Sequence, residues 1–262
     1  MEVYKYNSVF DHVDITLREL FSKNSNFDKT VFVLGYNVLK DLSFLRKKYI
    51  GYKIIVYQLE QLHSKSQWVN KESYKILTQA DEVWDYDQKN IEWMRKFYKI
   101  NANFLPLVYT DSLKTMDSVN SVNPDIDVLF YGYTQERRAK MMFNLQQKLS
   151  GNYKIFNIHG VWGDELNSYI SRSKIILNIH SSDIAVQEQV RMYHPVINGR
   201  CILSETSDIN YMGNSIIQVP YDKIVDTTIK LLETKKWKDH ALSCSEIYKK
   251  LSIDRRNSLK LK

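Results

Sequence analysis

Short aliphatic segments alternate with amphipathic helical segments along most of this chain, and this alternation restricts its fold more than any other feature. Segments such as TVFVLGY (30–36) and KIILNIH (174–180) are apolar at most positions. Strands of this kind are buried on both faces, because the helices that connect parallel strands cover those faces. The sequence therefore predicts an α/β fold built from βαβ units.

The pattern falls into two successive series. In the first, we predict strands over residues 30–36, 52–58, 81–86 and 103–109 and helices near 9–22, 37–48, 70–79 and 87–98. In the second, we predict strands over residues 126–132, 153–159, 174–180, 200–205 and 215–220 and helices over 135–149, 164–172, 185–197 and 221–234. Two Rossmann-like domains that face each other across a cleft are the expected architecture, with a reduced N-terminal domain.

A polar segment without periodicity separates the two series. Residues 110–124 are rich in Asp, Ser, Asn and Val, which is typical of a surface linker. We therefore predict an N-terminal domain over residues 1–109 and a second domain over residues 125–234. Residues 235–262 are expected to form a C-terminal helix and a basic tail.

The formal net charge of +7 favours an anionic partner, such as a nucleotide phosphate, an acidic lipid headgroup or nucleic acid. Much of the excess lies near the C-terminus, at Lys235, Lys236, Lys238, Arg255, Arg256, Lys260 and Lys262. A solvated helix face with a frayed tail explains this charge, and peripheral contact with an anionic membrane is the alternative.

The two cysteines, Cys201 and Cys244, have no paired spacing, so neither a disulfide framework nor a zinc site is predicted. No apolar run approaches the roughly 18 residues that a spanning helix needs, and the N-terminal residues do not resemble a signal peptide. We expect a soluble, cytoplasmic protein.

Polar residues close one of the most apolar strands. In SKIILNIHSSD (173–183), Asn178 and His180 stand at the carboxyl end of the strand, where doubly wound sheets bind their ligands. We therefore expect this stretch to form the floor of a binding crevice.

The loop YGYTQERRAK follows the first strand of the second series and opens a helix. Gly132 permits a close backbone approach, and Arg137 and Arg138 can form bidentate bonds with phosphate beside the helix N-terminus. The loop is suited to a pyrophosphate, although a glycine turn with two surface arginines would look the same.

Two further segments are candidates for nucleotide contacts. NIHGVWGDEL (157–166) is a loop that can hold a base, or else a glycine turn with acidic helix capping. Glu188 and Arg191 are three residues apart on a predicted helix. They form a surface pair, or Glu188 accepts hydrogen bonds from ribose hydroxyls.

These segments carry a resemblance to a known family. SKIILNIH, NGRCILSE and DIDVLFYGYTQERR resemble the nucleotide-sugar half of GT-B glycosyltransferases, particularly short forms from bacterial and large-virus polysaccharide gene clusters. YQLEQL, ADEVWDYDQKNIEWM and FLPLVY resemble the acceptor half. The resemblance implies sugar transfer from a nucleotide diphosphate sugar to a glycan or glycoconjugate, which can be lipid-linked, with no cofactor and no metal.

The same resemblance implies a set of substrate-binding residues. They are Gly132, Arg137 and Arg138 for the diphosphate, Val161 and Trp162 for the base, Glu188 for the ribose, Asn178 and His180 for the floor, and Arg191 beside them. Many retaining members carry two Glu separated by seven residues, but the second position is Val196 here. An inverting enzyme needs a general base, for which we select Glu60, with His63 and Asp85 as alternatives.

Asp125 and Asp127 spell a DxD motif, in which two carboxylates of other transferases hold a divalent ion. Here they precede a strand instead of following one, so we predict no metal role. Two other functions remain open: a nucleotide-sugar epimerase of the same fold and a basic nucleic-acid-binding protein. The second lacks the sequence signatures of the common nucleic-acid-binding modules.

Overall fold

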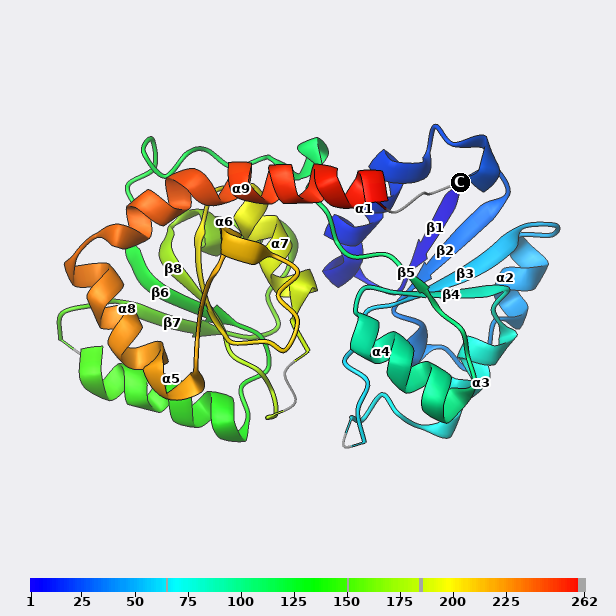
Figure 1. Cartoon of the computed structure of the whole chain (residues 1–262), viewed down its shortest axis with the longest axis horizontal. Coiled ribbons are helices and arrows are strands. Elements are labelled where there is room, and N and C mark those ends of the chain that lie inside the picture. Colours follow the sequence, from blue (N-terminus) through cyan, green and yellow to red (C-terminus); the bar gives the residue numbers. More distant parts are fainter. Residues whose placement is uncertain (65, 150, 184–185, 259–262) are drawn as a thin grey trace. The chain divides into compact units, whose positions relative to one another are not determined.

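The computed structural model describes residues 1–64, 66–149, 151–183 and 186–258 and contains two compact units, Met1–Leu107 and Val108–Ser258 (Figure 1). Each unit holds one five-stranded sheet in which every strand pair is parallel. Helices connect the strands and bury the apolar faces. The predicted α/β fold with two parallel sheets is confirmed.

The first sheet follows the order of the sequence. Its strands are β1 (Glu2–Lys5), β2 (Thr30–Leu34), β3 (Lys53–Gln58), β4 (Glu82–Asp85) and β5 (Asn103–Phe104), in the spatial order β1-β2-β3-β4-β5. The sequence did not predict β1, because this edge strand, EVYK, is only partly buried and carries no aliphatic run. The fourth predicted strand, 103–109, shortens to Asn103–Phe104, and the residues after it belong to no described strand.

Helices cover both faces of this sheet. They are η1 (Ser8–Phe10), α1 (Asp11–Phe21), η2 (Ser25–Phe27), η3 (Tyr36–Val38), α2 (Ser43–Lys48), α3 (Lys71–Gln79) and α4 (Gln88–Trp93), which continues as a π-helical turn, η4 (Met94–Tyr98). On one face Phe21 of α1 stacks on Phe32 of β2, with ring centroids 5.6 Å apart. On the other face α2, α3 and α4 pack Leu45, Ile76 and Ile91 into one apolar cluster.

In the second sheet all strand pairs are parallel, but the direction in which the chain adds strands reverses after the second strand. Its strands are β6 (Ile126–Tyr131), β7 (Ile155–Ile158), β8 (Ser173–Asn178), β9 (Cys201–Glu205) and β10 (Ile217–Val219), in the spatial order β10-β9-β8-β6-β7. The chain runs outward from β6 to β7 and then returns to the other side of β6. Ligands of doubly wound sheets bind at the carboxyl ends of the strands where this reversal occurs, which is between β6 and β8 here.

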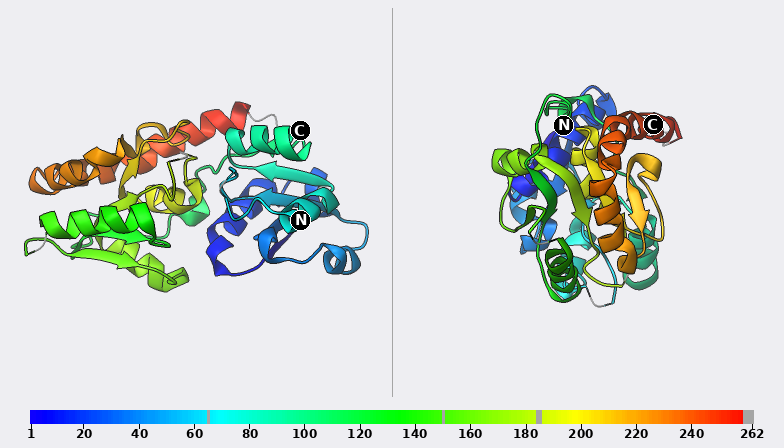
Figure 2. Two further views of the ribbon diagram at one scale, coloured as in Figure 1. Left: turned by 90° about the horizontal axis from the view of Figure 1, so that it is seen from below. Right: turned by 90° about the vertical axis from the view of Figure 1, so that its left-hand side faces the viewer.

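The helices of this unit are η5 (Asp111–Leu113), α5 (Glu136–Leu149), α6 (Gly163–Ser171), α7 (Gln189–Ile197), η6 (Gly213–Ser215), η7 (Tyr221–Lys223), α8 (Ile224–Glu233) and α9 (Lys236–Ser258). α5 and α8 pack on one face of the sheet, and the long α9 contacts α7 and β9 (Figure 2). The predicted basic residues Lys260 and Lys262, and the predicted helix start at residue 185, lie outside the described residues. No described helix is long and apolar enough to span a bilayer.

Residues 110–124, which we predicted as a linker, are tied to the second unit. Asn198, at the end of α7, accepts hydrogen bonds from the backbone N–H groups of Thr115 and Met116, both at 2.8 Å. The buried Arg200 donates to the carbonyl of Asp117 at 2.9 Å. The polar composition of the segment therefore does not mean that it is free, because side chains of the second unit bind its backbone.

We expect Asn198→Ala to lower the unfolding free energy of the second unit by about 2–4 kcal/mol, because the substitution leaves two backbone N–H groups and the carbonyl of Leu113 without their partner. Urea unfolding measures the loss. Asn152→Ala, at an exposed turn, is the matched control and should stay within about 0.5 kcal/mol of the wild type. Equal stability of the two variants would mean that the Asn198 contacts do not hold this segment.

Candidate functional site

Polar side chains gather at the carboxyl ends of β6, β8 and β9. Asn178 is the last residue of β8, His180 follows it by two residues, and Glu205 ends β9. All three are buried. The structure therefore places Asn178 and His180 at the edge of the sheet that the sequence indicated, next to the reversal between β6 and β8.

Glu188 lies at the centre of this group. We predicted it within a helix, but it is the N-cap residue of α7, and helical geometry starts at Gln189. Its Oε2 accepts hydrogen bonds from Asn178 Nδ2 at 2.9 Å and from His180 Nδ1 at 2.7 Å. Its Oε1 accepts from Arg138 Nη2 at 3.1 Å. The carboxylate is thus inside a network rather than in an exposed pair with its helix neighbour.

The charges in this network stabilise one another. Burial opposes ionisation of Glu188, but the hydrogen bond from His180 and the charges of His180, Arg191 and Arg138 outweigh it and lower the pKa of Glu188 to about 2. Burial also works against the charged form of His180, yet its bond to Glu188 gives a net rise in the pKa of His180. Both groups therefore favour their charged forms in the folded state.

Arg137 and Arg138, the two predicted phosphate contacts, are already engaged. Both terminal nitrogens of Arg137 donate to the carboxylate of Glu205 at 2.5 Å, and its guanidinium lies 4.1 Å from the ring centroid of Tyr221. Arg138 is buried and donates to the carbonyl of Ile179 as well as to Glu188. Burial and the neighbouring Arg191 lower the pKa of Arg138 to about 10, which leaves it charged at neutral pH.

Arg191 differs from these two arginines. Its Nη1 donates to Asn178 Oδ1 at 2.8 Å, while Nη2 and Nε have no hydrogen-bond partner among the described residues. We call this the open side of the guanidinium, because no described residue accepts a hydrogen bond from it. It lies against Gly132, where a Cβ would lie 3.1 Å from Nη2. Gly132 also has a φ of 133°, which favours glycine. The absence of a side chain at Gly132 therefore leaves room for the Arg191 guanidinium, whose Nη2 and Nε have no hydrogen-bond partner among the described residues.

Aromatic side chains stand at the same edge of the sheet. Tyr133, after β6, is 57% exposed, and its ring centroid is 5.3 Å from that of His159, after β7. Trp162, the N-cap residue of α6, is 47% exposed, and Val161 before it is half-buried. Tyr133 was not among the predicted site residues, although an aromatic residue directly after Gly132 was the available signal.

Glu205 is the other residue that we missed. Its signal was an acidic residue at the end of the strand RCILSE, at the same edge as Asn178.

The two carboxylates of the DxD motif, Asp125 and Asp127, lie at the amino end of β6. There Asp125 pairs with Arg172 at 2.6 Å and Asp127 with Lys174 at 2.5 Å.

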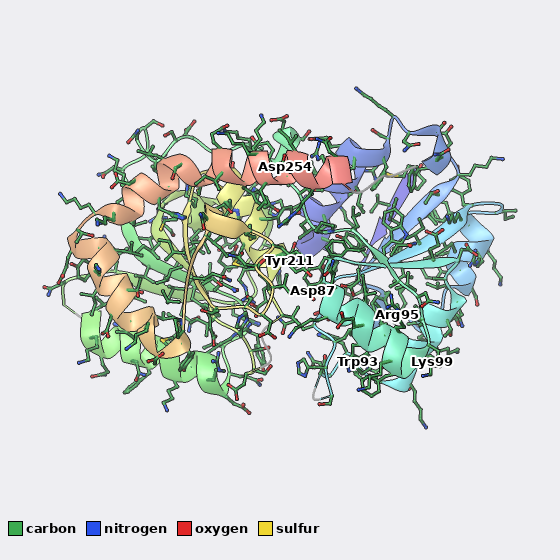
Figure 3. The ribbon with its side chains drawn as sticks, viewed as in Figure 1. Asp87, Trp93, Arg95, Lys99, Tyr211 and Asp254 are labelled. Carbon is green, nitrogen blue, oxygen red and sulfur yellow. The ribbon has the colours of Figure 1, made fainter. Side chains whose placement is uncertain are left out.

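The first unit has its own carboxylates at the carboxyl ends of β3 and β4. Glu60, two residues after β3, is half-buried, and burial raises its pKa to about 7. Asp85 ends β4 and is fully buried, which raises its pKa well above the ordinary value. Asp87 follows as the N-cap residue of α4 (Figure 3). His63, the other predicted alternative, lies further along the loop that contains Glu60.

Comparison with solved structures identifies the fold. The chain matches TarM with a TM-score of 0.54 at 8% identity, covering 95% of this chain and 58% of TarM. It matches Anabaena HepE, whose structure is a complex with UDP and glucose, with a TM-score of 0.58 at 7% identity, covering 89% of this chain and 78% of HepE. A glycosyltransferase from Rickettsia africae gives 0.50 at 10% identity, covering 97% and 82%. The protein has a GT-B-like fold, as the motifs predicted.

Sequence comparison finds distant relatives. No family model matches the chain. Two uncharacterised proteins of Acanthamoeba polyphaga mimivirus are each 28% identical to it, one over 165 residues and the other over 213. The matches cover 58% and 77% of this chain but 18% and 65% of those proteins. The chain therefore spans less than two thirds of the length of these relatives.

The low pKa of Glu188 predicts a pH-dependent contribution to stability. A folded-state pKa of about 2, below the ordinary 4.5, means that the stabilisation is present above pH 4.5 and is lost as the pH falls towards 2. At pH 5–6, Glu188→Gln should lower the unfolding free energy by about 3–5 kcal/mol, because it leaves Arg138 and His180 without their anion. The difference from the wild type should shrink as the pH approaches 2.

Urea unfolding at several pH values between 2 and 6 measures this difference. Glu165→Gln, in the exposed first turn of α6, is the control and should follow the wild type throughout. A difference between Glu188→Gln and the wild type that is independent of pH would show that Glu188 contributes packing instead of charge.

Proposed function

We propose that this protein is a glycosyltransferase that moves a sugar from a nucleotide diphosphate sugar to a glycan or glycoconjugate acceptor, in the assembly of a surface polysaccharide or similar product. The open side of Arg191 beside Gly132 is the observation that carries the proposal. It presents two unused donors at the reversal of a doubly wound sheet, where such sheets bind nucleotides. The GT-B-like fold supports the same reaction class.

Arg191 is the residue to which we assign the diphosphate. Two parallel N–H donors of a guanidinium match two phosphate oxygens and neutralise the charge that develops as the diphosphate departs. Arg137 and Arg138 add to the positive field, but direct contact from either requires exchange of its bond to Glu205 or Glu188. Their role is therefore mainly to hold the site in shape.

The remaining donor contacts follow from position. Tyr133 and Trp162 offer exposed rings beside which a base can stack, with Val161 between β7 and α6. Because Glu188 already accepts three internal hydrogen bonds, we assign it to support Arg138, Asn178 and His180 rather than to the ribose. HepE was solved with UDP and glucose, which supports a UDP-sugar as the first donor to test.

Glu60 is the group that we assign to the proton transfer of an inverting reaction. Its carboxylate takes the proton of the acceptor hydroxyl, the hydroxyl oxygen forms a bond to the anomeric carbon, and the bond from that carbon to the diphosphate breaks. A pKa of about 7 suits a general base at neutral pH, because the ionised form is present and still basic enough to accept a proton.

We propose that the reaction needs no metal. The carboxylates of the DxD motif support this, because Asp125 and Asp127 are paired with Arg172 and Lys174 at the opposite end of β6 from Gly132. Neutralisation of the leaving group then depends on arginine and on the helix N-terminus that follows β6.

Arg191→Gln should weaken the binding of UDP at least tenfold, because it removes the charge and the paired donors of the open guanidinium. Isothermal titration measures the affinity, and a thermal-shift panel of UDP, GDP, dTDP and CMP identifies the base. Arg172→Gln, which breaks a surface ion pair of the same unit, is the control and should bind UDP like the wild type. Equal affinity in both variants would remove Arg191 from the site.

Glu60→Gln should lower turnover by about 10²–10⁴-fold and leave donor affinity within a few fold, because it keeps the shape of the side chain and removes the base. In the wild type the rate should rise with pH through about 7, as Glu60 ionises. Glu72→Gln, exposed on α3, is the control.

We expect the turnover of the wild type to be unchanged when EDTA is added. Loss of turnover with EDTA and its recovery with manganese would contradict metal independence. Product analysis by NMR completes the test. Retention of the anomeric configuration would exclude the base role of Glu60, and conversion of the donor without any acceptor would favour the epimerase.

A further inference from the structure

The backbone at Glu60 is held by amide side chains and not by the sheet. The Glu60 N–H donates to Gln58 Oε1, and the Glu60 carbonyl accepts from Gln58 Nε2 at 2.7 Å and from Asn90 Nδ2 at 2.8 Å. Gln58 ends β3 and Asn90 lies in α4, so the two amides approach residue 60 from different elements. These bonds also settle the orientation of both amide groups.

One buried carboxylate holds both amides in turn. Asp85 Oδ2 accepts from Gln58 Nε2 at 2.8 Å, and Asp85 Oδ1 accepts from Asn90 Nδ2 at 3.1 Å and from the Asp87 N–H at 2.8 Å. Asp85 is fully buried, and no cation forms an ion pair with it within the parts of the chain that the structure describes. Such a group costs folding free energy, because burial penalises its charge.

We propose that Asp85 is a positioning residue, which fixes the Glu60 carboxylate in place by holding Gln58 and Asn90. The inference rests on the role that we assigned to Glu60. Asp85 does not contact a substrate in this mechanism. It acts through two amides, each of which donates both to Asp85 and to the Glu60 carbonyl.

The pattern of donors and acceptors explains why residue 85 is an acid. Gln58 Nε2 must donate to Asp85 while Gln58 Oε1 accepts from the Glu60 N–H. An Asn at position 85 can keep its oxygen towards Asn90 and the Asp87 N–H, but then it turns an NH₂ group towards Gln58 Nε2. Rotation of the Gln58 amide would relieve this contact and place Nε2 against the Glu60 N–H. In the opposite orientation the Asn oxygen accepts from Gln58, but its NH₂ group meets Asn90 Nδ2 and the Asp87 N–H. An amide at position 85 therefore disturbs Gln58 or Asn90, the two side chains that hold residue 60.

The burial of Glu60 depends on the same contacts. Burial is the cause of its raised pKa, and Tyr36 is the titratable neighbour, since the charges of Glu60 and Asp85 both help to raise the pKa of the Tyr36 hydroxyl. If the loop loosens, water reaches the carboxylate and its pKa falls towards the ordinary value of 4.5.

An NMR titration of ¹³C-labelled glutamate carboxyls tests this without any substrate. The Glu60 signal is assigned by its loss in Glu60→Gln. In Asp85→Asn, we expect the pKa of Glu60 to fall by about one unit or more from its wild-type value. Asp14→Asn is the matched control, since Asp14 is a buried acid of the same unit whose partners are Lys5 and Arg18. It should lower stability and leave the pKa of Glu60 unchanged.

If Asp85→Asn does not fold, Gln58→Met takes its place, because it removes the same bonds to residue 60 and keeps a similar volume. A Glu60 pKa within a few tenths of a unit of the wild type in the folded single variant would overturn the inference.

Turnover separates this inference from the proposed function. With the UDP-sugar that is active in the wild type, Asp85→Asn should lower kcat on the order of 10²-fold with little change in KM, as expected for a misplaced base. Full activity of Glu60→Gln would refute the base role of Glu60, while the titration would still decide whether Asp85 positions that side chain. Full activity of Asp85→Asn beside an inactive Glu60→Gln would refute the inference alone.

Discussion

The carboxylate of Glu188, whose side chain is 11% exposed, holds the candidate site of the second unit together. Because it occupies the N-cap position of α7 and its side chain does not bond to the helix backbone, its two oxygens reach Arg138 from α5, Asn178 at the end of β8 and His180 just beyond. Burying any of these groups alone costs free energy, and their shared bonds to one anion offset that cost. No described residue bonds to one side of Arg191, and this side makes the site a candidate for binding an anion.

The fully buried carboxylate of Asp85 has the opposite environment. Glu188 faces cations, so its pKa falls, whereas Asp85 faces neutral amides and burial raises its pKa. The first arrangement keeps arginines in place beside a proposed phosphate site. The second holds the loop of a half-buried Glu60, whose pKa moves towards neutrality. Carboxylates at the ends of parallel strands thus take different tasks according to what surrounds them.

The sequence predicted the fold more fully than the site. Strands such as β6 and β8 contain apolar runs, because both faces of a parallel sheet are buried. Both strands could therefore be predicted from the sequence. β1 could not, because an edge strand buries little and needs no such run. The composition of residues 110–124 likewise does not show that Asn198 and Arg200 bind the backbone of this segment.

The sequence by itself determined the α/β class, the two parallel sheets and the strand ends at which polar residues collect, because these depend on hydrophobic patterns within short segments. Only the tertiary structure decided which of those residues are engaged and which are available. Arg137 meets Glu205 across 68 positions of the chain, and Arg191 meets Asn178 across 13. A hydrogen-bond donor is open or occupied according to what folding brings beside it, and no local pattern in the sequence encodes that neighbour.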